Sequence, residues 1–157
     1  MKRVNLLLAS SDRRVHSIVE ATVRDVCYEQ ALVECTRAHG VEDFLRHSGS
    51  RWLDLILVEP DNLRPSSRRQ SRRPMLEQTA EAIRSLKSQR TTPVLALNVA
   101  PQHHTTLLEA GADNAFAYPL DAEALKAELR RLLRLDGPSE PAPAGGWSLA
   151  SVFLKGL

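Results

Sequence analysis

The stretch LDLILVEP at residues 53–60 decides the fold of this chain. Residues 55–58 are all apolar and leave no polar face, which is typical of a strand covered on both sides in a parallel α/β sheet. The run ends in Glu59, and Pro60 then stops the strand. Ligands of open α/β sheets bind at the carboxyl edge of the strands, so the surroundings of Glu59 decide the function.

The length and composition indicate one ordinary folded domain. The chain has 157 residues, of which 43% are hydrophobic and 25% are charged. Its formal net charge is +2, and subtracting the five arginines between positions 64 and 73 leaves −3 for the remainder. A basic segment on an otherwise acidic chain argues against a nucleic-acid-binding protein.

The cysteines and the apolar runs bear on the cellular compartment. No apolar run approaches the roughly 18 residues of a membrane span, and the first apolar run is too short for a signal peptide. We therefore expect a cytoplasmic protein with no membrane span. Cys27 and Cys35 are then expected to be reduced, structural thiols.

Strand-like and helix-like segments alternate along the chain. We expect strands at residues 4–9, 28–35, 53–59, 93–100 and 115–118. Helical spacing follows each of them, and Gly111 and Asp121 are expected to end the fourth helix and to cap the last one. Right-handed crossovers then predict an α/β, doubly wound (flavodoxin-like) fold: a five-stranded parallel sheet of order 2-1-3-4-5 with helices on both faces.

Helical periodicity also predicts which side chains face the core. Those of the four longer helices are Val15, Ile18, Val19, Thr22, Val23 and Val26; Val41, Phe44 and Leu45; Met75, Thr79, Ala82, Ile83 and Leu86; and Leu125, Leu129, Leu132 and Leu133.

Two segments fall outside this pattern. A long polar loop at residues 60–74 lies inside the folded domain of residues 1–136 and carries Arg64, Arg68, Arg69, Arg72 and Arg73. After that domain, residues 137–146 form a linker rich in Pro, Gly and Ala, which we expect to be flexible.

The last eleven residues, 147–157, are apolar again. They supply six large apolar side chains: Trp147, Leu149, Val152, Phe153, Leu154 and Leu157. Three of these share one face of a helix, the pattern of a peptide that docks in a partner's groove. Docking of the peptide on its own domain and weak contact with a membrane are the alternatives.

Residues 111–121 read GADNAFAYPLD and precede an amphipathic helix. This segment resembles the closing part of bacterial response-regulator receiver domains, which commonly read Gly-Ala-Asp-Asp-Tyr-x-x-Lys-Pro-Phe. Residues 53–59 are similar to the strand that carries their phosphorylated aspartate. The likeness spans about residues 2–135, and it implies the receiver fold.

The resemblance also assigns functional positions, and this chain departs from the family pattern at each. Receivers bind Mg²⁺ with an acidic pair at the end of the first strand, where this chain has Ser10 and Ser11, followed by Asp12. They carry the phosphoryl group on an aspartate where this chain has Glu59.

Three more positions differ at the fourth and fifth strands. The Ser or Thr of receivers is Asn98 here, and the Lys before the Pro is Tyr118. Their switch aromatic falls at Ala115, next to Phe116. Phosphoryl transfer depends on positioning and on charge neutralisation by a metal ion and a cationic side chain. All of these departures are therefore expected to weaken phosphoryl transfer.

The sequence therefore predicts a non-enzymatic pseudo-receiver with no metal and no cofactor. Glu59, one methylene longer than the aspartate it replaces, could hydrogen-bond Ser10, Ser11, Asn98 or Tyr118 without an ion. Ser10 and Ser11 are expected to cap a helix, since no histidine is placed to activate them as nucleophiles. The module would bind another protein in a bacterial regulatory or assembly system.

Alternatives to this hypothesis remain open. One is an atypical receiver phosphorylated on an acidic residue near the end of the third strand, with Asp61 the nearest aspartate. Another is binding of nucleic acid or an anionic surface by the arginine-rich loop. Receivers also often pair through the fourth helix, fifth strand and last helix, a face that would carry Tyr118, Lys126, Arg130 and Arg134 here.

Overall fold

The computed structural model describes residues 2–50, 52–63 and 74–134. The arginine cluster at 64–73, the linker at 137–146 and the apolar peptide at 147–157 lie outside the described residues. The domain boundary predicted at residue 136 lies outside them too.

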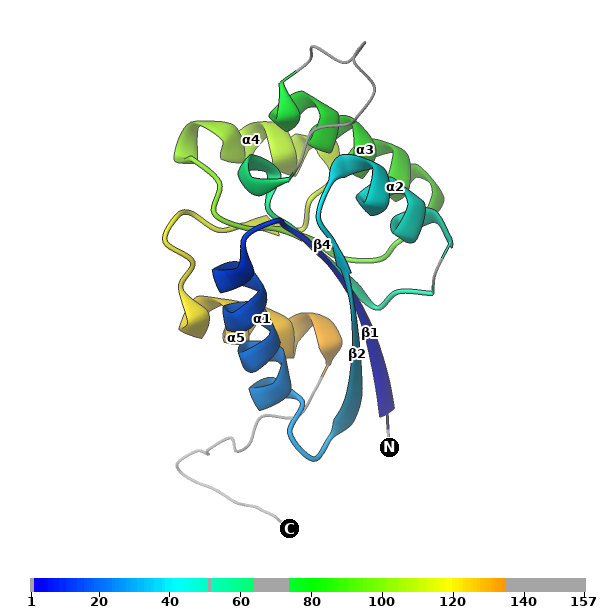
Figure 1. Cartoon of the computed structure of the whole chain (residues 1–157), viewed down its shortest axis with the longest axis vertical. Coiled ribbons are helices and arrows are strands. Elements are labelled where there is room, and N and C mark those ends of the chain that lie inside the picture. The colour runs from blue at the N-terminus through cyan, green and yellow to red at the C-terminus, as the bar shows by residue number, and fades with distance from the viewer. Residues whose placement is uncertain (1, 51, 64–73, 135–157) are drawn as a thin grey trace.

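The elements follow the predicted alternation (Figure 1). The strands are β1 (Lys2–Ala9), β2 (Ala31–Ala38), β3 (Leu55–Val58), β4 (Val94–Ala96) and β5 (Asn114–Ala115). The helices are α1 (Arg13–Val26), α2 (Val41–Ser50), a 3₁₀ turn (Pro60–Asn62), α3 (Met75–Gln89), α4 (Pro101–Ala110) and α5 (Ala122–Leu133). All strand pairs are parallel, and the order β2-β1-β3-β4-β5 confirms the predicted topology.

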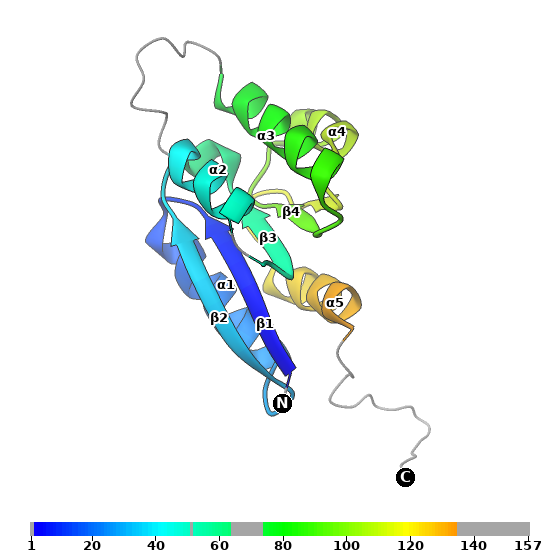
Figure 2. The ribbon, with the colours of Figure 1, turned by 90° about the vertical axis from the view of Figure 1, so that its right-hand side faces the viewer.

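Two helical layers cover the sheet, as Figure 2 shows with α1 and α5 on one side and α2, α3 and α4 on the other. Each layer closes its own apolar cluster. Leu55 and Leu57 of β3 point into the cluster under α1 and α5, while Ile56 and Val58 point into the other. All four side chains are fully buried, which explains why this strand is apolar on both faces.

The strands differ in length at the amino edge of the sheet. Pairing of β1 with β2 starts at Lys2 opposite Ala31, whereas pairing of β1 with β3 starts at Leu6 opposite Leu55. The first half of β1 therefore has a strand neighbour on one side only, among the residues that the structure describes.

The second strand was predicted three residues too early, at 28–35 instead of Ala31–Ala38. Helix α1 runs to Val26, and a turn in which Glu29 has φ 59° reverses the chain, leaving Tyr28 70% exposed. Because β2 is the edge strand, most of its side chains are half-buried or exposed, so its sequence lacks the apolar pattern that marks β3.

Two side chains predicted to face the core lie at the surface. Ile18 of α1 is 39% exposed and Leu45 of α2 is 48% exposed. Each sits at the border of its apolar stripe, beside fully buried neighbours such as Val19 and Phe44. The sheet beneath covers the centre of each stripe but not its margin, so periodicity overestimated the width of the buried face.

The helix ends predicted at Gly111 and Asp121 are confirmed, whereas the cap predicted at Ser10 and Ser11 is wrong, because Asp12 is the N-cap of α1. Asp121 Oδ1 accepts hydrogen bonds from the backbone N–H groups of Glu123 and Ala124, at 2.9 and 3.4 Å. Gly111 ends α4 with φ 120°, and a Cβ placed there would lie 2.9 Å from Cγ of Lys87. Only glycine adopts this backbone cheaply.

Candidate functional site

The carboxyl edge of the sheet brings together side chains from three strand ends. Ser10 follows β1, Glu59 follows β3 and Asn98 lies two residues past β4. The backbone holds the first two in place, because the Glu59 N–H donates to Ala9 O at 2.8 Å and the Ser10 N–H donates to Ala38 O at 2.9 Å.

Glu59 is the centre of this site. The Ser10 hydroxyl donates to Glu59 Oε1 at 2.6 Å, and the Asn98 amide donates to Glu59 Oε2 at 2.8 Å. Glu59 is 1% exposed and Ser10 is fully buried. A buried carboxyl group is tolerated only when it is hydrogen-bonded, and here both of its oxygens accept a bond from the protein itself.

Asn98 adopts an unusual backbone conformation to reach Glu59. Its φ of 54° lies in the left-handed region, where asparagine is one of the few non-glycine residues found regularly. Its Oδ1 is buried and has no hydrogen-bond partner. The side chain is therefore held for the contact that its Nδ2 makes with Glu59, at the expense of its carbonyl oxygen.

The other predicted site residues do other things. Asp12 caps α1 by accepting from the Arg14 N–H at 2.9 Å, and its own N–H donates to Ser10 Oγ at 3.0 Å. Ser11 is exposed, and Tyr118 is 75% exposed. The predicted set therefore splits into a buried trio of Ser10, Glu59 and Asn98 and three residues nearer to solvent.

The sequence analysis missed His16. Its Nε2 lies 2.6 Å from the carbonyl oxygen of Ser10, and its ring stacks on His39 with centroids 5.3 Å apart. A carbonyl oxygen only accepts, so His16 Nε2 carries the proton and donates it. His16 thus supports the backbone of Ser10 and not its hydroxyl. The sequence pattern that could have indicated a buried His16 is its position next to Val15, in the apolar stripe of the helix.

Metal ligation finds little support at this edge. Within residues 2–50, 52–63 and 74–134, no three His, Cys, Asp or Glu residues are grouped to hold a metal ion. His104 has a structural contact instead, because its Nε2 lies 2.9 Å from the carbonyl oxygen of Val99. Hard cations need several well-placed oxygen ligands, whereas both oxygens of Glu59 already accept hydrogen bonds from protein donors.

Both cysteines are free thiols. Burial raises the pKa of the Cys27 thiol, and it raises the pKa of the half-buried Cys35 to about 11. Neither is a reactive thiolate at neutral pH, which fits the predicted structural role.

Lys126, on the face predicted for pairing between two copies, forms ion pairs within its own chain. Lys126 Nζ lies 2.9 Å from Asp25 Oδ2 of α1 and 3.3 Å from Glu123 Oε2. These two carboxylates raise the pKa of Lys126, with the Asp25 hydrogen bond as the main cause. Lys126 therefore turns towards α1.

Comparison with known proteins gives a likeness in structure alone. No protein-family model and no curated protein sequence matches the chain. Among the described residues, no helix is long and apolar enough to cross a membrane.

Several solved structures match with high similarity in fold. The receiver domain of a sensor histidine kinase from Pseudomonas aeruginosa, with magnesium in its active-site cleft, is 19% identical at a TM-score of 0.61, covering 83% of this chain and 98% of its own. A signal receiver domain of a histidine kinase from Clostridium thermocellum is 14% identical at 0.63, covering 84% and 98%.

A protein assigned to pilus assembly in Burkholderia thailandensis is 17% identical at a TM-score of 0.59, covering 83% of this chain and 98% of its own. These identities are low, and what they share with this chain is the arrangement of strands and helices. The chain has the receiver-domain fold.

Proposed function

We propose that this chain is a non-phosphorylatable pseudo-receiver that serves as a protein-interaction module in a bacterial regulatory or assembly system. One observation carries the proposal. The side chain at the phosphoacceptor position, Glu59, is buried, and both of its oxygens accept hydrogen bonds from Ser10 and Asn98. A receiver needs its acceptor open to phosphodonor and metal.

The electrostatics around Glu59 support the same conclusion. The reaction needs a metal and a cation to neutralise the charge of the transferred phosphoryl group. The strand ends supply a hydroxyl and an amide instead, and Tyr118 stands where receivers have lysine. Two neutral donors can hold a carboxylate in one conformation, but they cannot replace that positive charge.

The interaction role rests on the fold and on the apolar peptide at 147–157. Receiver-like domains occur in a pilus assembly protein as well as in histidine kinases. A domain without phosphoryl chemistry still offers surfaces for partners. We propose the peptide as the element that binds one, because Trp147 and Phe153 are residue types that dominate protein interfaces.

Acetyl phosphate with Mg²⁺, followed by intact-protein mass spectrometry, tests the chemistry. We expect no adduct on the wild type. A gain of about 80 Da, the mass of a phosphoryl group on a carboxylate, would overturn the proposal. Asp61→Asn then serves as the matched variant, because Asp61 is the exposed acidic residue of the 3₁₀ turn that follows Glu59. An adduct lost in this variant would establish the atypical receiver instead.

A second experiment tests the peptide. Pull-downs from the native host, compared by quantitative mass spectrometry, should lose one partner with Trp147→Ala or Phe153→Ala and keep it with the control Ser151→Ala. The melting temperature should stay within about a degree, since truncating a side chain outside the core leaves stability nearly unchanged. A large drop in stability would place the peptide in the core of this protein and refute partner docking.

A further inference from the structure

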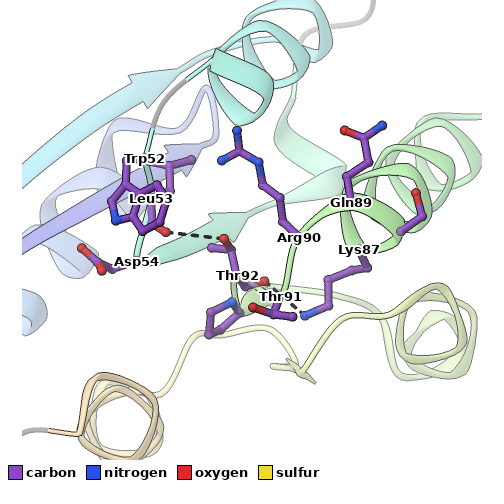
Figure 3. A pocket seen from close by; sticks show the side chains of 10 residues that line it. Trp52, Leu53, Asp54, Lys87, Gln89, Arg90, Thr91 and Thr92 are labelled. Atoms are coloured by element: carbon purple, nitrogen blue, oxygen red, sulfur yellow. Dashed lines mark hydrogen bonds between the residues drawn. The ribbon is translucent and has the colours of Figure 1, made fainter.

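A pocket opens at the amino edge of the sheet, opposite the edge that holds Glu59. Its volume is about 710 Å³, which lies within the usual range of small-molecule sites. Figure 3 shows its two walls: Trp52 and Asp54, which enter β3, lie on one side, and Lys87 and Arg90 at the end of α3 lie on the other. Nothing in the phosphoacceptor chemistry uses this pocket.

Trp52 is the most unusual residue of the pocket. Trp52 is 84% exposed, although the next residue, Leu53, is buried in the core. A large aromatic ring in water stabilises nothing in the isolated domain, while a planar ligand would gain stacking energy on its face. The indole therefore marks where a ring would bind.

Arg90 supplies the charge. It is half-buried, and its guanidinium donates to the carbonyl oxygen of Gly49 at 3.2 Å, which directs the side chain towards the end of α2 (Figure 3). Lys87 is engaged with Asp113 at 3.0 Å, and Asp54 accepts from the Asn5 N–H at 2.7 Å. Arginine is the side chain best suited to carboxylate and phosphate oxygens.

Polar side chains also line the pocket on the side of Arg90 (Figure 3). Ser88, Gln89 and Thr91 are exposed and line the pocket. They offer hydroxyl and amide groups that suit a sugar better than an apolar ligand. The neighbouring Thr92 is held in place, because its hydroxyl bonds the carbonyl oxygen of Leu53 at 3.4 Å and its carbonyl accepts from Lys87 at 3.1 Å.

We propose that this pocket binds a mononucleotide, with the base on the Trp52 ring, the phosphate at Arg90 and the ribose hydroxyl groups near the polar side chains that line the pocket beside Arg90. The three chemical requirements are a planar ring, hydroxyl groups and a negative charge. Each has a counterpart among the described lining residues. This site is independent of the pseudo-receiver proposal, and either can fail alone.

Tryptophan fluorescence of the full chain tests the proposal. The sequence has two tryptophans, so Trp147→Phe makes Trp52 the only reporter. We expect AMP, GMP, CMP or UMP to quench it saturably with a Kd of about 10–100 μM. Adenosine should bind at least about tenfold more weakly, because it lacks the charge that Arg90 recognises.

Variants separate specific binding from collisional quenching. Arg90→Gln should raise the Kd by about tenfold or more through the loss of a charge-assisted contact. Thr91→Glu, at an exposed lining position, should do the same by repulsion even if Arg90→Gln disturbs folding. Arg84→Gln, also on α3 but outside the pocket lining, is the matched control and should change nothing.

Calorimetry of Trp52→Leu completes the set, and we expect no heat of binding from it. The proposal is overturned if none of the four nucleotides quenches saturably. It is equally overturned if the Arg90→Gln and Thr91→Glu variants bind like the wild type, or if adenosine binds as tightly as AMP.

Discussion

Glu59 joins the ends of three strands through one side chain. At this position, the carboxyl group reaches both Ser10 on one side and Asn98 on the other. The site that catalyses phosphoryl transfer in receivers is here filled by a closed hydrogen-bond set. A buried acceptor left without its donor costs more free energy than the bond contributes, so these three residues depend strongly on one another.

Replacing Glu59 with Gln is the sharpest residue-level test. The Gln amide NH2 group can face the Ser10 hydroxyl only if that hydroxyl accepts instead of donating, and both contacts lose the negative charge that strengthens them in the wild type. We expect a loss of about 1–3 kcal/mol in the free energy of unfolding, measured by urea denaturation. Asp61→Asn, the exposed control, should stay within about 0.5 kcal/mol. Equal stability of Glu59→Gln and the wild type would refute the closed set.

At the scale of elements, the ends of the helices are set by particular backbone positions. Gly111 turns the chain from α4 towards β5 in a conformation that favours glycine, directly against the stem of Lys87. Lys87 in turn bonds Asp113, and Asp113 Oδ2 accepts from the Val94 N–H at 2.8 Å. This turn therefore links α3, α4 and the start of β4.

Two glycine substitutions with opposite expected signs test this turn. Gly111→Ala should destabilise the protein by about 1–3 kcal/mol, because alanine at positive φ is strained and its Cβ meets Lys87. Gly49→Ala in α2 has nothing within 4 Å of the added Cβ and should stabilise by up to about 1 kcal/mol. Thermal unfolding of both variants measures the difference. A neutral Gly111→Ala would show that the turn adapts.

Some elements were predictable from the sequence and others were not. The strand LILV could be identified because burial on both faces leaves a pattern along the chain, and the caps Asp121 and Gly111 because their chemistry is local. The edge strand β2 was predicted at the wrong position because few of its side chains are buried, so its sequence shows no clear apolar pattern. The ends of three strands meet by topology, so the trio around Glu59 could be predicted once the strand order was known.

His16 and the pocket at Trp52 were beyond sequence reasoning. Periodicity can place a ring on a buried face, but it does not say that this ring reaches a carbonyl oxygen six residues earlier in the chain. The pocket is built from residues 52–54 and 87–93, which have no shared motif and meet only because β3 and β4 are neighbours.

At the scale of the whole molecule, the chain has the receiver fold with Ser10 and Ser11 after its first strand. Apolar side chains buried on both faces of the sheet hold the domain together. A fold of this kind can therefore be stable whatever chemistry its carboxyl edge performs.

Magnesium provides the corresponding measurement. Millimolar Mg²⁺ should leave the melting temperature of the wild type unchanged, because a cation that binds no folded site adds no stability. The double substitution Ser11→Asp with Glu59→Asp adds one carboxylate next to Asp12 and shortens the one at position 59, and it should make the melting temperature rise with Mg²⁺. A rise of several degrees in the wild type, lost in Glu59→Gln, would reveal a metal site in the native chain.

Because the strands differ in length, we expect the two edges of the sheet to differ in how easily they open locally. At the amino edge, Lys2 to Asn5 pair with β2 before β3 begins. At the other edge, a single side chain ties the ends of β1, β3 and β4. Amide protons at the start of β1 should therefore exchange with solvent through small local openings, and those beside Ala9 and Val58 only through much larger ones. We therefore expect local opening to begin at the amino edge, on the side of Trp52. The edge that carries the proposed nucleotide pocket is then also the edge that opens most often.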